Sequence, residues 1–346
     1  MAISIKASAP HRANRHAARL AVKLFAILVW AGLIIFLTFR VVPTSLDDNT
    51  YMNYFDGAQT ELAVQGGSLA ELYIYATNEP VWRMYSYSLG RIFSPENCVR
   101  LTIAISLLLL AIAAFLSGRP LLFLAMYAVT SGLLFNINYT QIRQGLALAV
   151  FLVAIRLSRR IRFSALLACL IHSSFLLLLL AVLVREIKTR TQAVVTISVS
   201  IIGGSLLLSQ LGISGMLGRR GYYEGFTDTN NINFWVGNIT IMLVVFLLAR
   251  WYSRLGGAAQ IQAKVLDISV LNTIGALLFS ILVAPIAGRF IINSYALQIY
   301  ALSDRKMPRK QPFWLFVFGW LLFQSYQLYG NVQHGADFFV SFRSLF

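Results

Sequence analysis

Charged side chains are scarce in this sequence. Only 12% of its 346 residues are Asp, Glu, Lys or Arg, whereas a soluble globular domain carries about 25%. A surface with so little charge could not be wetted if the chain were a water-soluble globule. The composition therefore excludes an ordinary soluble domain.

Signatures of metal, redox and nucleotide chemistry are missing as well. The two cysteines, Cys98 and Cys169, lie far apart and follow no metal-binding or redox spacing. Four histidines in the whole chain do not suggest a multi-histidine zinc site. There is no Walker loop and no Gly-x-Ser-x-Gly elbow. We expect neither a metal nor a cofactor.

Long apolar runs are abundant. Hydrophobic residues make up 58% of the chain, with runs at 101–116, 163–184 and 265–287. Each run is close to the ~17–25 residues that a spanning helix needs. The pattern predicts an all-α, polytopic transmembrane helix bundle of about 9–11 membrane segments, in a single integral membrane domain over residues 1–346.

Basic residues indicate which side of the membrane each loop faces. Most Lys and Arg, including every lysine, lie in the N-terminal segment or in short segments between apolar runs, as in cytoplasmic loops. Residues 1–19 then form a cytoplasmic tail, and residues 40–98 and 212–233 form extracytoplasmic loops. The run 20–39 lacks a clear cleavage site, so we expect a retained first helix rather than a signal peptide. This topology explains the net charge of +16 without nucleic-acid binding.

The apolar run 163–184 fits this topology only if the chain turns within it. His172, Ser173 and Ser174 interrupt the run. If the chain turns there, each arm is too short to cross about 30 Å of hydrocarbon, and every basic segment faces the cytoplasm. We therefore expect a broken or re-entrant hairpin with His172 at its tip, on the outer side.

The outer side of this topology carries arginines and no lysine. Arginine recognises phosphate and carboxylate groups through paired hydrogen bonds, and it keeps its charge near lipid. The bias predicts a binding site for an anion. The residues concerned are Arg40, Arg83, Arg91, Arg100, Arg143, Arg219, Arg220, Arg289 and Arg343.

The first outer loop places acidic residues beside aromatic ones. Asp47 and Asp48 precede Tyr51 and Tyr54, and Glu79 follows later in the loop. Carboxylates next to aromatic rings suit sugar handling, because the acid can deprotonate a hydroxyl while a ring stacks on the sugar. The alternative is that the two aspartates cap the helix that follows them.

Four further positions have both a functional and a structural interpretation. Facing lipid would cost Arg143 about 2.5–3.5 kcal/mol, so it is expected in a polar cavity unless it snorkels into headgroups. His172 is a general base, a phosphate ligand or a satisfied packing residue. Gly288 and Arg289 are expected to cap a helix break, where Arg289 either binds an anion or anchors the interface. Arg219, Arg220 and Tyr222 in the third outer loop either bind an anion or anchor the interface.

These groups, in this order, resemble the Wzy/EpsG-type exopolysaccharide and O-antigen polymerase family, and the likeness covers most of the chain. Where that family usually has Gly-Thr-Asp, this chain has Ser45-Leu46-Asp47-Asp48, so the resemblance does not choose between the two aspartates. The matching features are Arg40, Asp47 and Tyr51, then Glu79-Pro80, Tyr139 with Arg143-Gln144-Gly145-Leu146-Ala147, and His172-Ser173-Ser174.

The resemblance implies a bacterial inner-membrane glycosyltransferase with a cytoplasmic N-terminus. It would polymerise polyprenyl-diphosphate-linked oligosaccharide repeats into exopolysaccharide, capsule or O-antigen at the outer leaflet, among membrane lipids and with chain-length regulator and flippase proteins as partners. Arg143, Arg219, Arg220 and Arg289 would hold the diphosphate; Asp47, Asp48, Glu79 or His172 would deprotonate the acceptor; and Arg40, Tyr51, Tyr54, Arg83, Tyr139, Gln144 and Tyr222 would bind substrate.

Two other function classes fit part of the pattern. A lipid-linked glycan transporter, or flippase, also uses intramembrane arginines, but it favours internal repeats, and none is convincing here. A membrane O-acyltransferase could use His172 as its base. It would need acyl-donor access from the cytoplasm, so an outward-facing His172 counts against it.

Overall fold

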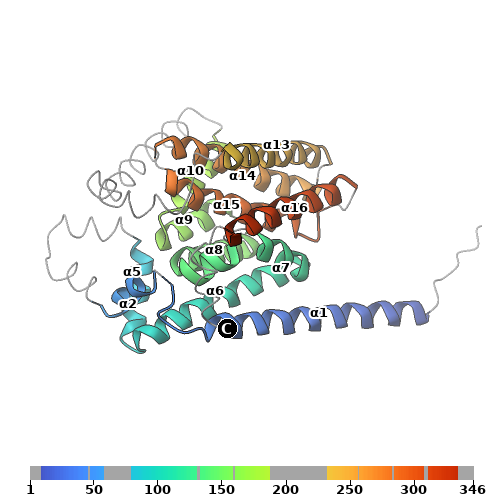
Figure 1. The fold of residues 1–346 in the computed structure, drawn as a ribbon. Helices are drawn as coiled ribbons and strands as arrows, with labels where there is room; N and C mark the ends of the chain where they lie inside the picture. The colour runs from blue at the N-terminus through green and yellow to red at the C-terminus, as the bar shows by residue number, and fades with distance from the viewer. Residues whose placement is uncertain are drawn as a thin grey trace, which may run out of the picture.

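The computed structural model of the chain describes residues 9–45, 47–57, 79–130, 133–158, 160–187, 232–255, 257–282, 284–307 and 311–333. All regular secondary structure in these residues is helical (Figure 1). Four helices in this part are long and apolar enough to cross a membrane, at Leu20–Thr38, Pro95–Ser117, Trp235–Leu255 and Gln260–Leu278. The structure confirms the predicted fold class, a polytopic helical bundle.

Prolines and one glycine set several of the helix boundaries. Pro80, Pro95 and Pro120 each begin a helix, where the missing N–H costs no hydrogen bond. Gly118 ends the second of these helices in the left-handed region, at φ +79°.

The elements are α1 (Ala9–Thr38), α2 (Asp48–Phe55), α5 (Pro80–Gly90), α6 (Pro95–Ser117), α7 (Pro120–Val129), the π-helix η1 (Leu133–Thr140), α8 (Ile142–Ser158), α9 (Ile161–Ile171), α10 (Phe175–Arg185), α13 (Ile232–Leu255), α14 (Gly257–Leu282), α15 (Ala284–Leu302) and α16 (Gln311–Gln333).

Helix α8 lies near the centre of the bundle. Its side chains are buried around most of its circumference, among them Leu146, Leu148 and Phe151, as expected for a helix that is apolar on every side. Helices α6 and α9 pack against it, and α13, α14 and α15 form a second packed group (Figure 1). The first turn of α8 contains Arg143, so this arginine lies at the N-terminal end of the central helix.

Helices α9 and α10 form the hairpin predicted about His172. Extended backbone at this residue, with φ −148° and ψ 125°, ends α9. Arg162 near the start of α9 pairs with Glu186 just after α10, so the two arms run back alongside each other. An arm of 11 residues is about 16 Å long, roughly half the hydrocarbon thickness. The broken helix is thereby confirmed.

The side of the membrane at the base of this hairpin stays a prediction, which cysteine labelling tests. In a background with Cys98 and Cys169 replaced by alanine, we expect Ile187→Cys to react with an impermeant maleimide only in inside-out vesicles. Asn53→Cys, exposed in α2, is the matched probe for the other side and should react in intact cells. Labelling of position 187 in intact cells would overturn the topology and the outward position of His172.

The predicted helix break at Gly288 and Arg289 is wrong. Both residues lie inside α15, which starts at Ala284, and α14 ends at Leu282. The boundary coincides with Pro285, because proline favours the first turn of a helix and cannot continue the previous one. Gly288 is accommodated within an apolar helix, and Arg289 therefore projects from the second turn of α15.

Candidate active site

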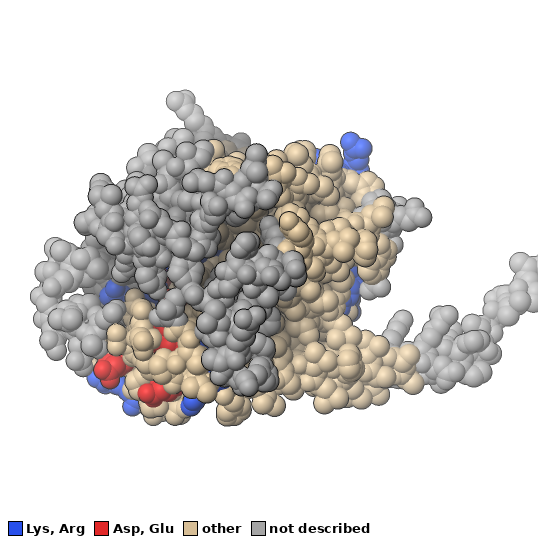
Figure 2. All heavy atoms as spheres, in the orientation of Figure 1, with Lys and Arg blue, Asp and Glu red and all other residues tan. Residues whose placement is uncertain are grey.

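One end of the bundle brings together segments that are far apart in the sequence. Helices α2 and α5 pack on each other there, and α5 also packs on α9 of the hairpin. On the face seen in Figure 2, acidic side chains gather at this end. Gly90 permits the close approach, because a Cβ at this position would lie 1.8 Å from the carbonyl oxygen of Phe55.

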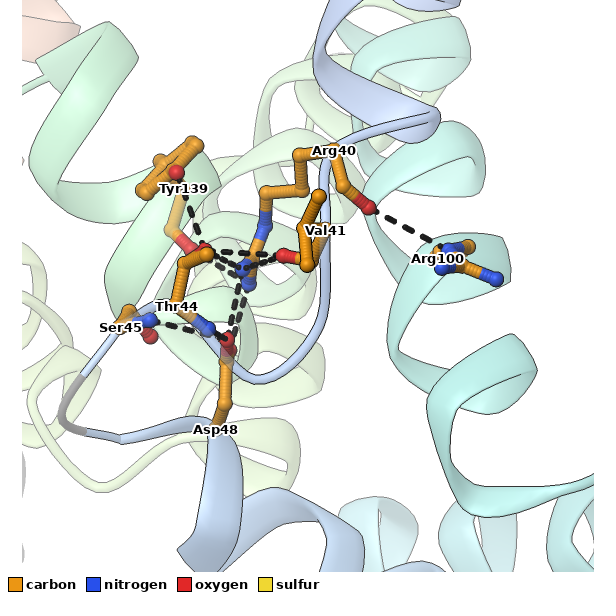
Figure 3. A network of polar contacts seen from close by, with 7 residues as sticks. All are labelled: Arg40, Val41, Thr44, Ser45, Asp48, Arg100 and Tyr139. Atoms are coloured by element: carbon orange, nitrogen blue, oxygen red, sulfur yellow. Dashed lines mark hydrogen bonds and ion pairs between the residues drawn. The ribbon is translucent and has the colours of Figure 1, made fainter. Parts of the chain in front are cut away.

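Arg40 and Asp48 form a closed pair at this end (Figure 3). The two terminal nitrogens of Arg40 donate to the two carboxylate oxygens of Asp48 at 2.6 and 2.5 Å. One of them also donates to the carbonyl of Tyr139 at 3.1 Å, and the guanidinium lies 4.4 Å from the centre of that ring. The backbone N–H groups of Thr44 and Ser45 donate to the same carboxylate. This network fastens the end of α1 to α2 and to η1.

The pairing with Arg40 determines the ionisation state and the role of Asp48. Burial by itself raises the pKa of Asp48, but the hydrogen bonds and charge of Arg40 and the two backbone N–H groups outweigh it and lower that pKa. Asp48 is therefore ionised and fully occupied. It does not cap α2, because its backbone donors precede the helix, and Asp47 at the N-cap position makes no side-chain capping bond. The contacts of Arg40, Asp48 and Tyr139 favour a structural role over substrate binding.

Breaking the pair should therefore cost stability. We expect Arg40→Ala to lower the free energy of unfolding by ~3–5 kcal/mol, because it leaves a buried carboxylate unpaired. Equilibrium unfolding of the purified protein in mixed micelles measures this change. Arg91→Ala removes an exposed arginine that contacts Tyr87 in its own segment and should shift stability by less than about 0.5 kcal/mol. Equal stability of the two variants would contradict the structural role of Arg40.

Glu79 joins Arg143 to the tip of the hairpin. Arg143 donates to one carboxylate oxygen of Glu79 at 2.5 Å, and the backbone N–H and hydroxyl of Ser173 donate to the other at 2.9 and 3.1 Å. Burial alone raises the pKa of Glu79, but the charge of Arg143 and the Ser173 hydrogen bonds act against it and lower that pKa. Glu79 is therefore ionised and engaged on both oxygens.

The backbone of Glu79 is strained at this junction. Its φ of +58° and ψ of +58° place a residue with a side chain in the left-handed region, at a cost of order 1–3 kcal/mol. The ion pair with Arg143 and the contacts with Ser173 hold it there. Such strain persists where surrounding structure fixes a side chain in one position, and here it fixes the carboxylate between α8 and the hairpin.

Arg143 faces protein groups and not lipid, as its cost in lipid predicts. Its guanidinium lies 5.1 Å from the ring centre of Tyr54, 5.8 Å from that of Tyr51 and 6.0 Å from that of Trp82. The Tyr54 hydroxyl also lies 3.4 Å from one of its terminal nitrogens. Its Nε is buried with no hydrogen-bond partner in the described part of the chain. An unused buried N–H donor of a cation is suited to an anionic ligand.

His172 is placed as a hydrogen-bond donor. Its Nδ1 accepts the backbone N–H of Ser174 at 3.1 Å and lies 4.0 Å from the Glu79 carboxylate. Because the lone pair of Nδ1 is engaged by this N–H, the neutral ring carries its proton on Nε2. Neither nitrogen then offers a free lone pair to an acceptor hydroxyl. The geometry favours His172 as a donor at the site over His172 as the general base.

Asp47 differs from the other three acid–base candidates. Its carboxylate is half-buried and makes no hydrogen bond or ion pair with any residue that the structure describes. Burial raises the pKa of Asp47 above the usual range, and the charges of Arg289 and Arg143 reduce this effect without cancelling it. An available carboxylate with a raised pKa is the arrangement expected of a general base.

Arg289 supplies a second cation close to Asp47. Its half-buried side chain makes no ion pair with the described residues, while its charge acts on Asp47. Gln144 donates to the carbonyl of Arg289 at 2.9 Å, and Asn293 donates to the carbonyl of Ser174 at 3.0 Å. These amides hold α15 against α8 and against the hairpin tip.

Sequence reasoning missed two of these positioning residues. Ser173 was named without a role, and Asn293 was not named. The amide of Asn293 in an apolar helix could have indicated its role, because polar groups there need partners.

The other predicted site residues are placed as follows. Arg83 is buried in α5, one residue after Trp82. Arg219, Arg220 and Tyr222 lie outside the described residues. Within those residues, no three His, Cys, Asp or Glu side chains group closely enough to hold a metal.

Comparison with known proteins identifies one family. The family model described as the EpsG family matches residues 23–342, nearly the whole chain. No curated protein and no solved structure matched significantly. The match covers every site residue discussed above and agrees with the resemblance seen in the ordered motifs. The chain therefore belongs to the EpsG family.

Proposed function

We propose that this protein is a glycosyltransferase of the bacterial inner membrane that polymerises polyprenyl-diphosphate-linked oligosaccharide repeats into exopolysaccharide, with its site at the outer leaflet. Membership of the EpsG family supports a polymerase-type membrane protein. The observation that carries the reaction is the combination of Asp47, a carboxylate without a described partner, with Arg143 and Arg289 at the same end of the bundle.

The proposed step is a substitution at the anomeric carbon of the growing chain. Asp47 accepts the proton of the acceptor hydroxyl, whose oxygen forms the new bond to that carbon. The carbon–oxygen bond to the lipid diphosphate breaks, and the diphosphate leaves with the bonding electron pair. Arg289 and the unused Nε donor of Arg143 stabilise the negative charge of the leaving group.

The remaining residues hold these groups in place. Glu79 fixes the guanidinium of Arg143 and the hairpin tip, and it neutralises part of the local positive charge before substrate binds. Nε2–H of His172 is a donor for a phosphoryl or sugar oxygen. Tyr54, beside Arg143, offers an aromatic face and a hydroxyl to the sugar.

Polymerisation by the purified protein tests the proposal. The protein, reconstituted in proteoliposomes with a lipid-linked repeat unit as its sole substrate, should give a ladder of longer lipid-linked glycans. Neither a nucleotide sugar nor an acyl donor should be required. If the protein instead moves the lipid-linked repeat across the bilayer without lengthening it, the chain is a transporter and the proposal fails.

A further inference from the structure

A second charged cluster lies at the opposite end of the hairpin, where α10 meets the spanning helices α13 and α14. Asp267 in α14 is almost buried and accepts from two arginines. Arg185 at the end of α10 donates to one of its oxygens at 3.2 and 3.3 Å, and Arg250 in α13 donates to the other at 2.7 Å. The two arginines and one carboxylate leave one positive charge in excess.

The surroundings of this cluster add to the excess. Glu186 follows Arg185 and accepts from Lys264 at 2.6 Å, and it also pairs with Arg162. Four cations therefore face two carboxylates among the described residues of this region. The excess of positive charge at this end attracts an anion.

The two arginine side chains are also partly exposed and are not used up by Asp267. The Arg185 and Arg250 side chains are 41% and 48% exposed, and each guanidinium has five N–H donors, of which Asp267 takes only part. The Asp267 carboxylate holds both guanidinium groups, one on each oxygen. The pair is thus preorganised to bind a phosphate through several charge-assisted hydrogen bonds.

An apolar groove leads away from the two arginines between α10, α13 and α14. Its volume is about 330 Å³, within the range of small-molecule sites. Leu243, Phe246 and Ile274 in its wall are exposed at the surface of the spanning helices, where lipid chains lie. The groove is lined by Arg185, Met242, Leu243, Phe246, Arg250, Asp267, Val270, Leu271 and Ile274.

We propose that this groove binds a phospholipid with an anionic headgroup, such as phosphatidylglycerol, whose phosphate pairs with Arg185 and Arg250 while an acyl chain fills the apolar part. A basic pocket between spanning helices suits such a lipid. The site is distinct from the proposed diphosphate site, because α10, which separates Arg185 from the hairpin tip, is about 16 Å long. The proposal does not depend on the polymerase activity.

Lipid retention by the full-length protein tests this site. We expect native mass spectrometry of the purified protein to show bound phosphatidylglycerol after exchange into nanodiscs that contain equal phosphatidylglycerol and phosphatidylcholine with the same acyl chains. The triple variant Arg185→Gln/Asp267→Asn/Arg250→Gln removes the whole charge set without leaving a buried carboxylate unpaired. Its affinity for phosphatidylglycerol should fall about 30-fold, with phosphatidylcholine binding unchanged.

The matched control is Arg254→Gln, which removes an exposed arginine of the same helix that does not line the groove. It should retain phosphatidylglycerol as the wild type does. The proposal is overturned if the triple variant keeps wild-type selectivity, or if phosphatidylcholine competes equally. It is also overturned if polyprenyl phosphate displaces phosphatidylglycerol from the wild type, because the groove would then hold the substrate's lipid.

Discussion

Replacing Arg143 by alanine should reduce polymerisation by the purified protein about 100- to 1,000-fold, because a preorganised donor to the leaving group is lost. Cells with this variant should carry single repeat units on their lipid-linked glycan. Arg143→Lys should recover only part of the activity, since an ammonium cannot contact Glu79 and a diphosphate in the fork geometry of a guanidinium.

The design of this experiment must separate catalysis from folding. Arg143→Ala leaves the buried Glu79 carboxylate without its cation, which by itself destabilises the fold. The double variant Glu79→Gln/Arg143→Ala removes both charges, so its activity can be measured without an unpaired buried carboxylate. Arg91→Ala, which removes an exposed arginine just after α5, is the matched control and should polymerise normally. Accumulation of unflipped precursor inside Arg143→Ala cells would point to transport and contradict the assignment.

The bundle and the hairpin were predictable because they depend on local pattern. Apolar runs must be buried in lipid or protein, and a polar His-Ser-Ser interruption between two short apolar arms leaves few other solutions. The turn at His172 was predictable because only a turn there places every basic segment on the same side of the membrane. The break predicted at Gly288 lies a few residues after the boundary between α14 and α15, because Pro285 sets that boundary: only proline lacks the N–H that continues a helix.

The roles of the acidic residues could not be predicted, because they depend on partners distant in the sequence. Asp47 and Asp48 are neighbours, yet only Asp48 meets Arg40, and that pair is completed by the carbonyl of Tyr139 on η1. Glu79 is engaged by Arg143 and by the hairpin tip. Which carboxylate stays available is decided by how α1, α2, α8 and the hairpin meet, and residue types alone do not determine that.

The contacts of Asp47 and Asp48 predict different effects when each charge is removed. Removal of the Asp48 charge should mainly weaken folding, because its folded pKa is lowered. The stabilisation it provides is present at neutral pH and is lost as the pH falls below the usual pKa of an aspartate towards the lowered one. Removal of the Asp47 charge should mainly weaken catalysis, because Asp47 has no described partner to lose.

Asp47→Asn should therefore slow polymerisation about 100- to 10,000-fold with little change in stability. The wild-type rate should rise with pH and level off above the pKa of Asp47, because only the ionised carboxylate accepts the acceptor proton. Since burial raises that pKa, the acidic limb should lie above the usual aspartate range, and it should be absent from the residual rate of Asp47→Asn. Rates measured from pH 4 to 8 with purified protein check this. If Asp47→Asn keeps the wild-type rate while a stably folded Glu79→Gln loses it, the proton acceptor is Glu79.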